Sequence, residues 1–205
     1  MAVAVPQTDT KSTKTTWTID PNHTLVEFGV KHMMVATVRG RFTGVTGQLI
    51  ADEANSESSQ FEAEIDAASI DTRNEQRDAH LRSADFLDVE SFPTITFRST
   101  RIEPISTERG RLIGDLTIRG VTREVTIDAT MNGRGTTPFG QEIVGFTGET
   151  SIKRQDFGLT WNVALETGGV LVGDTVKIQL EVELVKQVQD LPTPNTIESE
   201  SSALS

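Results

Sequence analysis

Apolar and polar residues alternate with a period of two along most of this 205-residue chain, and this pattern constrains the fold more than any other feature. Such alternation is typical of antiparallel strands that bury one face and expose the other. In one run Val26, Phe28, Val30 and His32 share a face, and charged residues occupy the opposite face. Turn residues separate the runs, and residues 119–122 predict a tight hairpin. The pattern therefore predicts an all-β protein with about eight strands.

The chain is long enough for one all-β domain with a full core. Antiparallel strands joined in sequence by short links either stack as two sheets or close into a barrel, and closure removes exposed sheet edges. An eight-stranded barrel is either packed solid or holds one small ligand. The inward rows combine glycines with long Phe and Met side chains, which either bends the strands or leaves room. The residues by themselves leave these alternatives open.

The segment from Ser69 to Phe97 breaks the alternation. Thr72 with Glu75 has the spacing of a capping box, and the residues that follow favour a helix until Pro93 precedes a new alternating run. We therefore predict a short helix inserted around residues 73–86. A second irregular segment, residues 155–173, is long and apolar, as lids and binding loops often are.

Composition and charge exclude several classes of partner. The net charge of -11 disfavours nucleic acid and anionic membrane surfaces, because affinity for either depends on Lys and Arg. No window approaches the roughly 18 apolar residues of a membrane span, so we expect no stable membrane insertion. The first residues lack a basic start followed by an apolar stretch, and the expected location is therefore cytoplasmic.

The two ends of the chain differ from the middle in composition. Residues 1–15 and 187–205 are rich in Thr, Ser, Gln, Pro and Glu without an apolar period. Such a composition does not offset the entropy of ordering. We predict two disordered tails that flank one folded domain, residues 16–186.

The motifs of catalytic and metal-binding proteins are missing from the sequence. His23, His32 and His80 lie in separate elements without the spacing of an HExxH motif. A GxSxG elbow, a GxGxxG loop and a P-loop lysine are also absent. We predict no catalytic residues, no metal site and no cofactor.

An ordered series of short motifs carries a family resemblance over roughly residues 17–185. It includes Trp17 to Thr24 (WTIDPNHT), Val26 to Met33 (VEFGVKHM), Gly40 to Phe42 (GRF), Ser69 to Thr72 (SIDT), Arg77 to Leu81 (RDAHL), Asp85 to Asp88 (DFLD), Phe92 to Phe97 (FPTITF), Gly114 to Arg123 (GDLTIRGVTR) and Asp156 to Gly158 (DFG). In this order the motifs resemble the YceI-like family of polyisoprenoid-binding proteins. The resemblance implies a lipocalin-like, eight-stranded antiparallel barrel that holds a long isoprenoid chain.

An isoprenoid chain requires an elongated apolar pocket, because its affinity comes from removing hydrocarbon from water. The expected function is non-catalytic binding, storage or transport of a polyisoprenoid lipid, such as an isoprenoid quinone or a prenyl precursor. Inward register, or a place in the 155–173 segment, selects the candidate lipid-binding residues Val26, Phe28, Val30, His32, Phe42, Phe97, Leu116, Phe146, Ile152 and Trp161.

Two alternatives remain at this stage. One is an enzyme that acts on a prenyl lipid with Asp85, His32 or His80 as acid or base. The other is a packed barrel whose outer surface contacts a protein partner. A homodimer would suit such a fold, although no sequence feature requires one.

Overall fold

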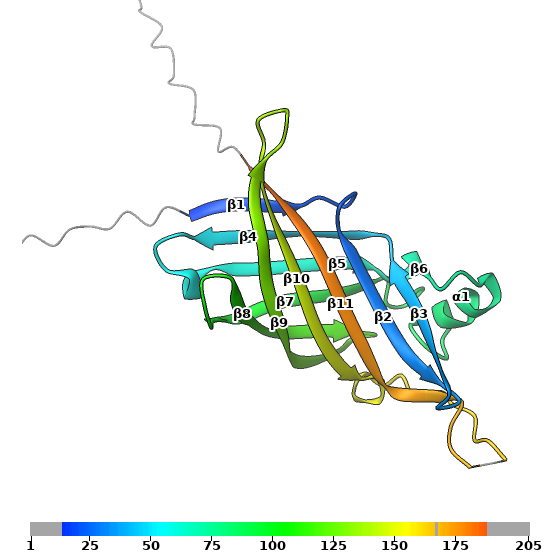
Figure 1. The fold of residues 1–205 in the computed structure, drawn as a ribbon. Coiled ribbons are helices and arrows are strands. Elements are labelled where there is room, and N and C mark those ends of the chain that lie inside the picture. The colour runs from blue at the N-terminus through cyan, green and yellow to red at the C-terminus, as the bar shows by residue number, and fades with distance from the viewer. Residues whose placement is uncertain (1–13, 167, 188–205) are drawn as a thin grey trace, which may run out of the picture.

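The computed structural model describes residues 14–166 and 168–187 as a closed antiparallel barrel with one short α-helix (Figure 1). Eight strands close the ring, because β11 pairs with β10 on one side and with β1 on the other. In spatial order they are β1 (Lys14–Ile19), β4 (Val45–Asp52), β5 (Gln60–Asp66), β7 (Thr94–Pro104), β8 (Arg109–Ile118), β9 (Val121–Thr136), β10 (Glu142–Lys153) and β11 (Val172–Lys186). The predicted all-β, eight-stranded barrel with a short helix is confirmed.

Three further strands extend the sheet at one end of this ring. They are β2 (Leu25–His32), β3 (Ala36–Phe42) and β6 (Ile70–Asp71). β11 is long enough to pair with β1 through its last residues and with β2 through its first ones. β3 then pairs with β2 and with β6. The barrel wall therefore continues beyond the ring on one side, toward the helix (Figure 1).

The connection between β8 and β9 is the predicted tight hairpin. Arg119 and Gly120 both have positive φ, 49° and 72°, the conformation of a type I′ turn. A Cβ atom on Gly120 would lie 2.7 Å from the ring of Phe92, so this position requires glycine for space as well as for backbone conformation.

The helix α1 (Glu75–Arg82) is shorter than the predicted 73–86 and has a different cap. The predicted capping box of Thr72 and Glu75 is wrong. Asn74 is the N-cap, and its side chain accepts a hydrogen bond from the backbone N–H of Arg77. Thr72 instead binds Asp78, because the chain enters the helix through Arg73 in a left-handed conformation that turns Thr72 toward the barrel.

Two apolar clusters occupy the two halves of the barrel. One contains Trp17, Ile19, Val26, Val45, Val144 and Leu184, and it fills the half where β1 and β4 close the ring. The other lies nearer α1, and its buried members include Ile95, Phe97, Leu116, Ile118, Ile127 and Ile152. The second cluster forms the walls of the cavity described below.

The predicted tails lie almost wholly outside the described residues. β1 begins at Lys14, inside the stretch predicted as the N-terminal tail, and Gln187 donates a backbone hydrogen bond to Thr16. Among the described residues, no helix is long and apolar enough to cross a membrane.

Candidate functional site

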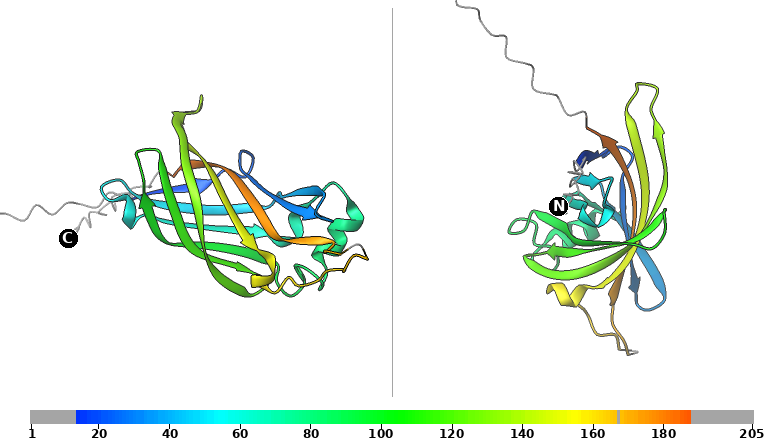
Figure 2. Two further views of the ribbon diagram at one scale, coloured as in Figure 1. Left: turned by 60° about the horizontal axis from the view of Figure 1, so that its bottom comes forward. Right: turned by 90° about the vertical axis from the view of Figure 1, so that its left-hand side faces the viewer.

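An apolar cavity of about 380 Å³ lies inside the half of the barrel that faces α1. This volume falls in the lower part of the roughly 300–1,000 Å³ range of small-molecule sites. The inner faces of β2, β3, β5 and β7–β11 form its walls. Further lining comes from β6, from α1 and the residues that follow it, and from the segment that follows Phe157. Figure 2 shows α1 and this segment at the same end of the molecule.

Nine of the ten predicted lipid-binding residues line this cavity, and Phe146 does not. Phe146 packs in the opposite half of the barrel, against the cluster that contains Val144 and Leu184. The structure therefore places Phe146 outside this cavity. The nine that line the cavity are Val26, Phe28, Val30, His32, Phe42, Phe97, Leu116, Ile152 and Trp161.

Most of the lining side chains were not among the predicted residues. Some of them stand in the same period-two rows that the sequence shows, so the signal for their inward direction was present. Others come from α1 and the segments around it, where the sequence has no apolar period that predicts their direction. The missed residues include Val38, Ile70, Leu81, Phe86, Ile118, Val125, Ile127, Leu171, Val176, Ile178 and Leu180.

Lining residues that keep some contact with solvent lie on β2, β3, α1 and the segment between Leu159 and Val172, and also on β5, β9, β10 and β11. In contrast, Phe97, Leu116 and Ile127 on β7, β8 and β9 are buried. We take the mouth of the cavity to be at the end where α1, the β2–β3 turn and the 159–172 segment gather (Figure 1), because Lys31, Arg77, His80 and Trp161 line the cavity there and are exposed or half-buried.

An aromatic cluster joins the elements around this mouth. The imidazole of His80 meets the rings of Phe86 and Trp161 edge-on, with ring centroids 5.0 and 4.7 Å away. The rings of Phe86 and Trp161 lie 5.2 Å apart. Nε2 of His80 lies 3.0 Å from a carboxylate oxygen of Asp85, which fixes the orientation of the imidazole. His80 thus holds α1 to the 159–172 segment.

Polar contacts, rather than an apolar helix face, attach α1 to the barrel. The buried carboxylate of Asp78 accepts hydrogen bonds from the backbone N–H and the hydroxyl of Thr72. Arg77 donates to the hydroxyl and the carbonyl of Thr72, at 2.7 and 2.8 Å. Arg82 donates to the carbonyl oxygens of Ala68 and Ile70, both at 2.8 Å. Since charged groups are costly to bury unless they are hydrogen-bonded, these pairings fix the position of the helix.

Arg154 fixes the 159–172 segment through hydrogen bonds to its backbone. Its guanidinium is buried and donates to the backbone carbonyls of Leu159, Trp161, Val172 and Gly173. Desolvation by burial lowers the pKa of Arg154, and the nearby Asp174 carboxylate opposes that effect. All of these carbonyls belong to the chain that carries Trp161, so Arg154 places Trp161 at the mouth. Its donors are engaged and do not point at a ligand.

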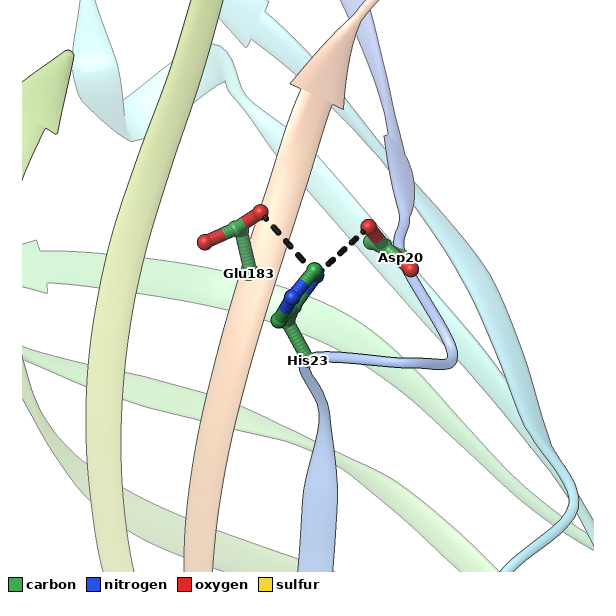
Figure 3. Close-up of side chains that lie close together, drawn as sticks. All are labelled: Asp20, His23 and Glu183. Carbon is green, nitrogen blue, oxygen red and sulfur yellow. Dashed lines mark hydrogen bonds and ion pairs between the residues drawn. The ribbon is translucent and has the colours of Figure 1, made fainter. Parts of the chain in front are cut away.

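A charged cluster lies on the turn between β1 and β2 (Figure 3). Nδ1 of His23 is 2.9 Å from a carboxylate oxygen of Asp20 and 3.6 Å from one of Glu183. The hydrogen bond to Asp20 raises the pKa of His23, and the same bond lowers the pKa of Asp20. None of the three residues lines the cavity. In the described part of the chain this is the one group of three His, Asp or Glu side chains close enough to share a metal ion, and His32 and His80 stand elsewhere.

A larger hollow of about 1070 Å³ lies on the outer face of the curved sheet formed by β2, β3 and β8–β11. Its lining consists mainly of outward-facing charged and hydroxyl side chains, such as Arg39, Arg123, Glu149 and Lys177. It is a solvent-facing curvature of the sheet, and the enclosed apolar cavity is the candidate functional site.

A closed β-barrel that is packed in one half and hollow in the other defines a class of small cavity-bearing barrels. The sequence matches the YceI-like domain over residues 17–184, and the chain belongs to the YceI-like family. A UPF0312 protein of Staphylococcus epidermidis is 39% identical over 170 residues, which cover 82% of this chain and 96% of the relative.

Solved structures share the fold. The crystal structure of BcnA from Burkholderia cenocepacia aligns with a TM-score of 0.68 and 25% identity, over 80% of this chain and 98% of BcnA. A polyisoprenoid-binding domain from Saccharophagus degradans, implicated in plant cell wall breakdown, aligns with a TM-score of 0.58 and 13% identity. That alignment covers 83% of this chain and 98% of the domain, and at this identity it supports the shared fold alone.

Proposed function

We propose that this protein binds a polyisoprenoid lipid in the cavity without chemical change, and thereby stores or carries it. The observation that carries the proposal is the composition of the cavity wall, which consists mainly of Val, Ile, Leu, Phe and Trp side chains. Such a wall gains affinity from hydrocarbon removed from water, at about 25 cal/mol per Å² of apolar surface. A branched prenyl chain supplies that surface and needs few directional contacts.

The polar side chains near the mouth suit a ligand whose polar head group stays near solvent. The polar side chains in this part of the lining include Lys31, His32, Thr72, Arg77 and His80. Arg77 already donates to Thr72 and His80 is paired with Asp85, so these groups offer a polar rim rather than a dedicated anion site. An isoprenoid quinone or a prenyl alcohol suits this rim, and the polyisoprenoid named for the Saccharophagus degradans domain belongs to the same chemical class.

The surroundings of the mouth favour a carrier over an enzyme. Asp85 and His80 are hydrogen-bonded to each other, but the ring of His80 is held edge-on between Phe86 and Trp161. The edge-on contacts of His80 therefore give the His80–Asp85 pair a structural role in the cavity wall. His32 and His80 lie on different elements, and the contacts of His80 do not include His32.

Native mass spectrometry followed by organic extraction tests the proposal. The purified protein is incubated with geranylgeraniol or with an isoprenoid quinone. A stoichiometric mass increment that extracts as the unmodified lipid would support a carrier. Extraction of a chemically altered lipid would indicate an enzyme, and no uptake of either probe would contradict the proposal.

Two neighbouring positions on β11 provide a matched pair of variants. Ile178 lines the cavity, and Gln179 is exposed on the opposite face of the same strand. Ile178→Trp should fill the cavity and abolish lipid uptake, at a cost of about 1–3 kcal/mol in the free energy of unfolding for overpacking. Gln179→Trp adds the same side chain outside the barrel and should leave uptake unchanged. Circular dichroism verifies that both variants are folded.

A further inference from the structure

An exposed apolar tip lies beside the mouth of the cavity. It consists of the β2–β3 turn, Met33–Val35, together with Val163 and Val170 of the neighbouring segment. The exposed fractions of these side chains are 45, 63 and 86% for Met33, Met34 and Val35, and 45 and 38% for Val163 and Val170. The two parts are adjacent, because the backbone N–H of Met33 donates to the carbonyl of Leu171 at 2.8 Å.

The tip is continuous with the lining of the cavity. His32, which directly precedes Met33, lines the cavity, and so does Leu171, which directly follows Val170. On the side of Leu171 and Val170, apolar residues therefore lead from the lining of the cavity to the outside. A ligand that leaves the cavity by this route passes the tip first.

The backbone of this turn is strained, because its two central residues have a conformation that methionine rarely adopts. Met33 and Met34 both have positive φ, 50° and 61°, and the N–H of Val35 donates to the carbonyl of His32 at 3.1 Å. This is a type I′ arrangement, which is normally occupied by Asn and Gly. Two long side chains in left-handed conformation at an exposed position lower stability. Strain of this kind concentrates at functional sites.

Charge on the tip does not explain its exposure. Met33–Ala36 and Gly168–Leu171 contain no charged residue, and Glu166 is the single charged residue between Val163 and Val170, although the whole chain has a net charge of -11. A partner recognised by this surface is therefore bound through hydrocarbon contact rather than through ion pairs. Methionine side chains are flexible and adapt to an irregular apolar surface.

We infer that the tip docks the protein on the surface of a lipid bilayer and places the mouth of the cavity against the source of its ligand. This inference rests on the proposed function, because it takes a membrane lipid as the ligand. Met33, Met34, Val35, Val163 and Val170 enter the boundary between head groups and acyl chains, and the contact is reversible because it involves few side chains. Docking is strongest on zwitterionic membranes, since the net negative charge opposes binding to anionic ones.

Vesicle flotation in a density gradient tests the inference. The full chain is mixed with vesicles of phosphatidylcholine, or with vesicles that also contain phosphatidylglycerol. We expect flotation with phosphatidylcholine that persists at high salt, and weaker flotation when phosphatidylglycerol is present. Absence of flotation with phosphatidylcholine, or flotation that needs the anionic lipid, would overturn the inference.

A double variant separates docking from folding. Met33→Asn with Met34→Gly installs the preferred residues of a type I′ turn, so it should fold at least as well as the parent chain. Its flotation should fall by about tenfold or more, because the apolar area is lost. The control is Ile105→Asn with Phe139→Gly, which removes two other exposed apolar side chains, in turns away from the mouth, and should float like the parent. Equal flotation of the tip variant and the parent would contradict the inference.

A second readout distinguishes this inference from the proposed function. Uptake of geranylgeraniol dispersed without a membrane should be unchanged in the tip variant, whereas transfer of the lipid from vesicles should slow in step with flotation. If the parent chain takes up no dispersed lipid, the proposed function fails. If it takes up lipid but the tip variant changes a dimer into a monomer without any effect on vesicles, the tip is an interface between copies and only the inference fails.

Discussion

At the scale of single residues, the shape of the cavity depends on where a side chain is missing. A Cβ atom on Gly40 of β3 would overlap the ring of Phe28 and would lie 2.7 Å from a methyl group of Thr72. Phe28 lines the cavity, and its ring packs 5.7 Å from that of Phe42. Gly40 therefore makes room for the Phe28 ring against the wall.

Substitution of Gly40 by Ala should drive the Phe28 ring into the cavity. We expect a loss of about 1–3 kcal/mol in the free energy of unfolding, as for other overpacked sites, together with weaker lipid uptake. Chemical denaturation and native mass spectrometry measure the two effects. The double variant Gly40→Ala with Phe28→Leu should recover uptake, and if it does not, the ring of Phe28 is not the cause.

The His23 cluster makes a prediction about pH. The raised pKa of His23 means that its interaction with Asp20 and Glu183 stabilises the fold fully below the unfolded value of 6.5 and is lost as the pH rises through the folded value. The lowered pKa of Asp20 adds stability that is fully present above the ordinary carboxyl pKa of 3.8 and is lost as the pH falls through the folded value. Between about pH 6 and 8, the melting temperature of the parent should fall relative to that of His23→Gln. A pH-independent difference between the two melting curves would contradict the cluster as described.

The sequence predicted which face each residue takes, but not how far along the barrel it lies. Phe146 and Ile152 stand in the same inward row of β10, and both were predicted to line the lipid site. Ile152 lies in the hollow half and Phe146 in the packed half. A period of two reports the direction of a side chain from the sheet. Position along the barrel axis depends on strand register, which only the pairing partners determine.

At the scale of elements, the strands followed from sequence more closely than the elements at the mouth. The period-two runs and the hairpin at Arg119 and Gly120 carry local signals. The predicted cap of α1 is wrong because Thr72 and Asn74 are both good capping residues, and Thr72 is instead hydrogen-bonded to Asp78 inside the helix. The aromatic cluster joins His80 and Phe86 to Trp161, which is distant in sequence, so no local pattern predicts it.

Arg154 provides a test of how the mouth is held. Arg154→Lys keeps the positive charge but loses the planar fork that reaches the carbonyls of Leu159, Trp161, Val172 and Gly173. Leaving these acceptors without partners should cost roughly 2–3 kcal/mol in the free energy of unfolding. Hydrogen exchange should increase locally in residues 159–173, and lipid should dissociate faster. Uniform exchange across the barrel would show that Arg154 supports the whole fold rather than the mouth.

At the scale of the whole molecule, the barrel divides its interior between stability and binding. The half closed by β1 and β4 is filled by Trp17, Val144 and Leu184, among others. The half that faces α1 encloses the cavity of about 380 Å³. Sequence alone left open whether the barrel is packed or hollow, because Val, Ile, Leu and Phe serve equally in a core and in the wall of a lipid site. In the structure one half of the barrel is packed and the other half contains the cavity.

Two leucines on β11 test this division directly. Leu180 and Leu184 stand in the same inward row, but Leu180 lines the cavity and Leu184 is fully buried in the packed half. Leu184→Ala should cost about 3–5 kcal/mol in the free energy of unfolding, since it creates a void among close-packed neighbours. Leu180→Ala should cost less, about 1–2.5 kcal/mol, because part of its surface already faces empty space.

Chemical denaturation of both variants, without lipid and with saturating lipid, completes this test. Lipid binds only the folded state, so it should stabilise Leu184→Ala by as much as it stabilises the parent, about 2.7 kcal/mol at a concentration one hundred times the Kd. The gain should differ in Leu180→Ala, whose enlarged cavity changes the Kd itself. Equal costs for the two variants and equal gains from lipid would mean that both halves of the barrel are packed alike, and the cavity would then not be the site of binding.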